Sequence, residues 1–141
     1  KERALKVLDR CQESMPENVW PLDAIPLGFS TNDYMVVNMV SAYFAAGAPD
    51  KAAELGAKLG KELLASAHFY MEYYEYAQDE FEKSCQFLYF LVDELEKGGD
   101  KKVSAELKRS LVTLLRAGAE AYDQDYGNEA DSTVAEDTSA K

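Results

Sequence analysis

The chain has 141 residues, of which 47% are hydrophobic and 29% charged, and this composition suits one folded domain with a core of its own. The net charge of −11 argues against nucleic acid as a partner, because phosphates require a basic surface. It argues equally against direct docking on an anionic membrane.

The first predicted helix covers Glu2 to Met15 and is followed by a loop. Its apolar stripe consists of Ala4, Leu5, Leu8, Cys11, Gln12 and Met15, and Pro16 ends it. The segment Glu17–Phe29 contains two prolines and a glycine among large apolar residues. We expect it to be an ordered loop packed on the helices, with a functional lid as the alternative.

Two further helices are predicted around a tight turn. Ser30 can cap the first of them, with Asp33 three residues later in a capping-box arrangement. This helix should run to Ala46 and end at Gly47, which favours a left-handed stop. Pro49 then lies in the first turn of the next helix, where its missing N–H costs nothing.

Residues 61–97 contain neither Gly nor Pro, and a single helix of that length would be unusual. We expect a break near Ala77–Asp79, with Asp79 as the cap of the following helix. Gly98-Gly99-Asp100 predicts a turn, and a last amphipathic helix should run from Lys101 to about Tyr122.

The sequence divides into a helical domain, residues 1–122, and a tail, residues 123–141. The tail holds six acidic residues against one lysine and almost no large apolar side chain. We expect it to be disordered, with a specific acidic docking tail as the alternative.

A spacing of four, three and five residues occurs twice in the chain. The positions are Ala4, Leu8, Cys11 and Pro16 in the first helix, and Ala52, Gly56, Leu59 and Leu64 later. Tyr43 and Gly47 precede the second set, within the stretch "VSAYFAAGAPDKAAELGAKL". Small residues at a turn and on a helix face allow two antiparallel helices to approach closely.

This pattern resembles the tetratricopeptide repeat, with one full repeat, one half repeat before it and one degenerate hairpin over Phe81–Val112. The resemblance implies an all-α fold of antiparallel hairpins stacked as a right-handed superhelix, with the Pro-containing loop as an insertion. It also implies that a set of residues packs the helices together: Ala4, Leu8, Cys11, Pro16, Tyr43, Gly47, Ala52, Gly56 and Leu59.

The half repeat lacks its first helix, so we expect the chain to be a piece of a longer protein and the fragment to self-associate. The order of elements is similar to the helical tail of bacterial multi-pass membrane glycosyltransferase-like proteins, relatives of the protein O-mannosyltransferases. That resemblance implies catalysis in an absent membrane part and a periplasmic setting.

The stretch "HFYMEYYEYAQDEF" carries the only histidine, and a metal site is the first hypothesis it raises. On a continuous helix, His68, Glu72, Glu75 and Asp79 would share one face. The opposite face would hold Tyr70, Tyr73, Tyr74, Ala77 and Phe81. Because the apolar face seeks the core, we expect the acids to face solvent and predict no metal or cofactor.

Cys11 and Cys85 are isolated and are predicted to be buried free thiols, with a mutual disulfide as the alternative in an oxidising compartment. No catalytic residue is predicted, because no strained nucleophile turn or phosphate-binding loop accompanies the single histidine.

We therefore predict a non-catalytic scaffold domain that binds a protein or peptide, or the parent protein's own membrane region. The candidate partner-binding residues are Asn32, Tyr34, Met35, Asn38 and Met39 on the first hairpin, with Phe69 and Tyr76, and Tyr89 is also expected to be exposed. The alternatives are an accessory domain of a membrane glycosyltransferase and a small-ligand-binding helical bundle that uses His68.

Overall fold

The computed structural model describes residues 1–14 and 35–132, with side chains through Asp123. The described residues are almost entirely helical and include no strand, which confirms the all-α class. Its helices are α1 (Glu2–Ser14), α2 (Met35–Ala46), α3 (Pro49–Glu72), α4 (Tyr74–Gly98) and α5 (Lys101–Ser132). The predicted loop Glu17–Phe29 and the Ser30 cap lie outside the described residues.

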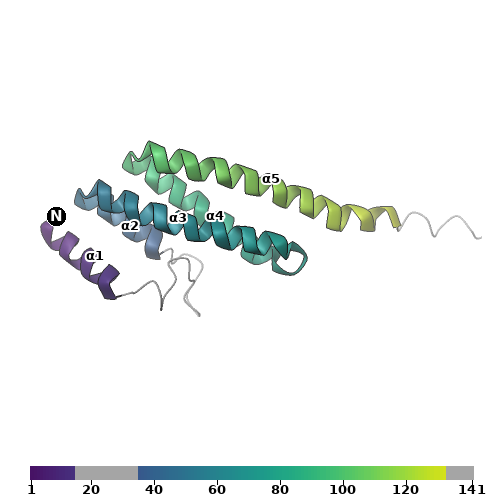
Figure 1. Cartoon of the computed structure of the whole chain (residues 1–141), viewed down its shortest axis with the longest axis horizontal. Helices are drawn as coiled ribbons and strands as arrows, with labels where there is room; N and C mark the ends of the chain where they lie inside the picture. Colours follow the sequence, from purple (N-terminus) through teal and green to yellow (C-terminus); the bar gives the residue numbers. More distant parts are fainter. Residues whose placement is uncertain (15–34, 133–141) are drawn as a thin grey trace, which may run out of the picture.

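Helices α3, α4 and α5 run antiparallel to their neighbours and form the body of the domain (Figure 1). Helix α2 packs against both α3 and α4, and α3 also packs against α5. Helix α1 lies at the edge and packs against α2. Each helix from α1 to α4 thus contacts the next helix along the chain, and α2 and α3 also contact the next but one.

The predicted turns are confirmed at both glycine positions. Gly47 ends the α2 segment with φ +84°, a left-handed conformation, and Pro49 is the first residue of α3. Gly99 has φ +91° after α4. The Asp100 carboxylate then accepts hydrogen bonds of 3.1 Å from the backbone N–H groups of Lys102 and Val103, which caps α5.

The long Gly- and Pro-free run does divide into two helices. The break predicted near Ala77–Asp79 is confirmed in part, because the backbone is non-helical at Ala77, but the helix boundary lies earlier and Asp79 does not cap a helix. The helix ends at Tyr73, whose N–H bonds to the Tyr70 carbonyl oxygen, and a second irregular residue follows at Ala77 (φ −130°, ψ 28°). Asp79 lies inside α4. Reversal at Tyr73 lets Tyr74 and Phe81 enter the core together, with ring centroids 5.5 Å apart.

The predicted end of the last helix near Tyr122 is also wrong, because α5 continues to Ser132. Residues 123–132 contain no proline that would stop the helix, although they include Gly127 and only three strong helix formers, Gln124, Glu129 and Ala130. In Figure 1 the last turns of α5 extend beyond the other helices. Residues 133–141 of the predicted tail lie outside the described chain.

The core depends on two glycines of α3 that are separated by one helical turn. A Cβ atom at Gly56 would lie 2.8 Å from Leu95 Cδ2 of α4, and one at Gly60 would lie 2.6 Å from Leu107 Cδ2 of α5. Both leucines are buried. Because no side chain intervenes, α4 and α5 can each pack directly on the backbone of α3.

We expect Gly60→Ala to destabilise the fold. The added methyl group would meet three atoms of Leu107, and such overpacking costs about 1–3 kcal/mol. Alanine has a higher helix propensity than glycine, and this difference offsets up to ~1 kcal/mol of the destabilisation. Chemical unfolding should therefore show a net loss of about 1 kcal/mol.

The control is the same substitution in a Leu107→Ala background. There the methyl group meets vacated space, so the additional loss of unfolding free energy should be smaller. An equal loss in both backgrounds would contradict the direct contact.

Candidate interaction surfaces

Most of the residues predicted to pack the helices of the repeat together are buried, but two of them are exposed. Tyr43, Ala52, Gly56 and Leu59 are buried, and Leu8 packs partly buried against the core. Gly47 occupies the turn, and Pro16 lies outside the described residues. Ala4 and Cys11 are exposed, which corrects their predicted packing roles.

The exposure of Cys11 has a geometric cause. The side of α1 that faces the other helices carries Leu5, Leu8, Asp9 and Gln12. Cys11 lies on the other side of the helix and therefore faces solvent. The prediction of a buried thiol is wrong for Cys11 and confirmed for Cys85. Both thiols are free, and burial together with the nearby Glu82 raises the pKa of Cys85 to about 11.

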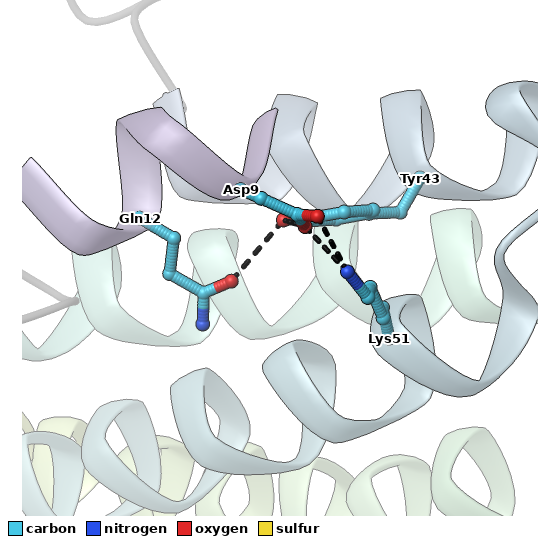
Figure 2. A network of polar contacts seen from close by, with 4 residues as sticks. All are labelled: Asp9, Gln12, Tyr43 and Lys51. Carbon is cyan, nitrogen blue, oxygen red and sulfur yellow. Dashed lines mark hydrogen bonds and ion pairs between the residues drawn. The ribbon is translucent and has the colours of Figure 1, made fainter. Parts of the chain in front are cut away.

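A polar network joins three helices around Tyr43 (Figure 2). The ring of Tyr43, from α2, is fully buried, and its hydroxyl lies 3.0 Å from Asp9 Oδ1 and 3.2 Å from Gln12 Oε1, both on α1. Lys51, from α3, donates to both oxygens of Asp9 at 2.6 Å. Its ammonium nitrogen also lies 6.0 Å from the centroid of the Tyr43 ring.

These contacts shift the ionisation of both acidic groups. The hydrogen bond from Lys51, followed by that from Tyr43, lowers the pKa of Asp9. Burial, together with the bond to Asp9, raises the pKa of Tyr43 to about 12. The network therefore fixes α1 on the α2–α3 hairpin through an ionised carboxylate and a neutral phenol.

Sequence reasoning placed Tyr43 in the repeat but missed its polar partners. The available signal was Gln12, a polar residue on the apolar stripe of the first helix, with Asp9 beside Leu8. The contact between Lys51 and Asp9 could not be predicted from the sequence, because it depends on the angle at which α1 crosses the α2–α3 hairpin.

The predicted partner-binding residues of α2 do not form one surface. Met35 and Asn38 are exposed, whereas Met39 is 8% exposed and belongs to the core, which corrects its predicted role. Neighbouring helices α1, α3 and α4 cover most of α2 and leave little of it for a partner. Asn32 and Tyr34 lie outside the described residues.

Three aromatic side chains project from the reversal between α3 and α4, which we call the aromatic turn. Phe69, Tyr73 and Tyr76 are 57%, 52% and 84% exposed. The rings of Phe69 and Tyr73 lie 5.2 Å apart between centroids. The exposure predicted for Phe69 and Tyr76 is confirmed, whereas Tyr73, predicted to be a core or rim residue between helices, faces solvent because the helix breaks there.

The same reversal separates the residues of the metal hypothesis. His68 and Glu72 belong to α3, whereas Glu75 and Asp79 belong to α4, so the four do not share one continuous helix face. All four are exposed, as predicted. Over the residues that the structure describes, no group of three His, Cys, Asp or Glu side chains is placed to hold a metal ion.

A second apolar surface lies between α4 and α5, and we call it the α4–α5 groove. It has a volume of about 430 Å³ and is lined by Phe81, Glu82, Cys85, Gln86, Tyr89, Phe90, Leu111 and Leu115. Tyr89 and Leu115 are 62% and 51% exposed. Sequence reasoning anticipated the exposure of Tyr89 but missed the groove, whose signal on α5 was the four-residue spacing of Leu111 and Leu115.

Comparisons with models of known protein families, with curated proteins and with solved structures find no match for this chain. Among the described residues, none of the helices combines the length and the apolar character needed to cross a membrane.

We expect Tyr43→Phe to loosen α1 and leave the remaining helices folded. The substitution removes the hydroxyl shared by Asp9 and Gln12, and one such hydrogen bond contributes about 1 kcal/mol. Native-state hydrogen exchange should show about fivefold faster opening of the α1 amides. Tyr89→Phe, on the exposed surface, is the matched control, and equal protection of α1 in both variants would contradict the role of the network.

Asp9 should make the folding stability of the domain depend on pH in the acidic range. Its pKa is lower in the folded state than its ordinary value of 3.8, so its contribution is present above that value and disappears as the pH falls through the lowered pKa. The melting temperature of the native chain should exceed that of Asp9→Asn at neutral pH. The two should converge in strongly acidic buffer, and a constant difference would contradict this linkage.

Proposed function

We propose that this domain is a non-catalytic protein-interaction module that binds a basic segment of a partner at the aromatic turn. The observation that carries the proposal is the joint exposure of Phe69, Tyr73 and Tyr76. Aromatic side chains supply much of the binding energy in protein interfaces, because they bury a large area with little loss of conformational freedom.

The charges around the aromatic turn favour a cationic partner. Glu72 and Glu75 are exposed beside the three rings, and both line a shallow hollow of about 240 Å³ together with Tyr73 and Tyr76. An arginine guanidinium can stack on an aromatic ring while it bonds to a carboxylate. The net charge of −11 would add long-range attraction for such a segment.

The helical arrangement supports a scaffold built like a tetratricopeptide stack. The contacts of α2 with α3 and α4, and of α3 with α4 and α5, suit stacked hairpins. The handedness of the stack remains part of the proposal. The accessory role beside a membrane glycosyltransferase and the small-ligand bundle remain predictions, since no contact in the described residues favours them.

A peptide selection tests the proposal. Purified domain should enrich peptides rich in arginine and lysine from a displayed random library. The dissociation constant of an enriched peptide, measured by calorimetry, should rise at least about tenfold in the double variant Phe69→Ala/Tyr76→Ala. Both residues are exposed, so the variant should retain the melting temperature of the native chain.

Tyr89→Ala provides the matched control, because Tyr89 is similarly exposed but lies in the α4–α5 groove. It should bind the peptide as the native chain does. Failure to enrich basic peptides, or equal binding by the double variant, would rule out the aromatic turn as the site.

A further inference from the structure

The negative net charge of the chain comes from two stretches of sequence that contain neither lysine nor arginine. They are residues 62–82 and residues 117–140, and they are bordered by Lys61, Lys83 and Arg116. Together they hold 13 of the 26 acidic residues, so their formal charge is −13, whereas the rest of the chain carries +2. The excess of acid is therefore confined to these two segments, which we call the first and the second acidic stretch.

The fold brings the two acidic stretches together at the aromatic turn. Glu72 and Glu75 of the first stretch line the hollow there, and Ala121 of the second stretch lines the same hollow. About one helical turn before Ala121, Gly118 lies against Phe81 of the first stretch. The reversal between α3 and α4 lies at the end of the bundle toward which α5 runs (Figure 1). One end of the bundle is therefore built from segments that contain acids and no lysine or arginine.

Helix α5 carries this acidic character past the aromatic turn. It continues for eleven residues beyond Ala121 to Ser132, a distance of roughly 17 Å at 1.5 Å per residue. We call its last part, residues 123–132, the α5 extension. The acidic residues in its sequence are Asp123, Asp125, Glu129 and Asp131. Because Tyr126 is its only large apolar residue, the α5 extension is suited to charged partners rather than to burial of an apolar helix face.

We propose that the basic segment bound at the aromatic turn continues along the α5 extension, where the acids of this helix hold its second half. This inference rests on the proposed function and deepens it, because it gives the partner a second contact region and a minimum length. About five residues of extended chain span the roughly 17 Å from the hollow to the end of the helix. The partner is therefore a segment whose lysines and arginines continue for at least about five positions beyond the one anchored on the aromatic rings.

Charge complementarity favours this partner. The first acidic stretch supplies the exposed carboxylates of Glu72 and Glu75 beside the rings, and the second supplies those of the α5 extension. Carboxylates gathered at one end of a molecule create a negative potential that attracts and orients a cationic chain. The attraction between such exposed groups is screened by salt, so the second contact should contribute most at low ionic strength.

Two polyarginine peptides, of three and of nine residues, separate the two contact regions. The short peptide is long enough for the aromatic turn alone, whereas the long one spans roughly 30 Å when extended and can occupy both regions. Titration of the full chain at low ionic strength, followed by nuclear magnetic resonance, gives the dissociation constant of each peptide.

The test variant is Asp125→Asn/Glu129→Gln/Asp131→Asn, which removes three negative charges from the α5 extension. It should raise the dissociation constant of the nine-residue peptide at least about fivefold, because three charge pairs are lost. The constant of the three-residue peptide should stay within about twofold of its native value. Circular dichroism should show the same helix content as the native chain.

The matched control is Asp50→Asn/Glu54→Gln/Glu106→Gln, which removes the same number of charges. These three acids are exposed and lie near the starts of α3 and α5, at the ends of these helices opposite the aromatic turn. The control should leave both dissociation constants within about twofold of the native values. Equal weakening of the nine-residue peptide by the test variant and the control would overturn the inference, because net charge alone would then explain the binding.

The aromatic double variant Phe69→Ala/Tyr76→Ala separates this inference from the proposed function. If it weakens both peptides while the test variant binds the nine-residue peptide as the native chain does, the α5 extension is no part of the site and the proposed function stands. If it binds both peptides as the native chain does, or if the native chain binds neither, the proposed function fails and this inference fails with it.

Discussion

The close approach of α4 and α5 to the backbone of α3 is the constraint on which the domain depends. Gly56 and Gly60 receive Leu95 and Leu107, and larger side chains at these positions would push the neighbouring helices outward. The same device recurs at Gly98, which lies against Phe44 of α2. With α3 in contact with α2, α4 and α5, displacement at one glycine would be transmitted to most of the core.

Helix α1 is held by a different kind of interaction. It contributes no fully buried side chain, and its docking depends on Leu5, Leu8 and the polar contacts of Asp9 with Tyr43 and Lys51. A polar connection at the surface is weaker and more sensitive to pH than apolar burial. We therefore expect the edge helix to open separately from the four-helix body.

The two candidate surfaces arise from two features of α4. The reversal at Tyr73, just before α4 begins, produces the aromatic turn, because it turns Tyr73 and Tyr76 to solvent. The middle of α4 lies beside α5 with no further helix on that side within the described chain, so Tyr89 remains exposed. One surface adjoins the exposed acids Glu72 and Glu75, whereas the other is lined mainly by apolar side chains.

The sequence by itself determined the helical class and the turns at Gly47 and Gly99, because local backbone preferences decide these features. It also indicated the close-packing role of Gly56. Only the tertiary structure decided where the 61–97 run reverses, because placing Tyr74 in the core outweighed the capping tendency of Asp79. Likewise, burial of Met39, exposure of Cys11 and the Asp9–Lys51 pair depend on the angle at which helices cross, which local spacing does not specify.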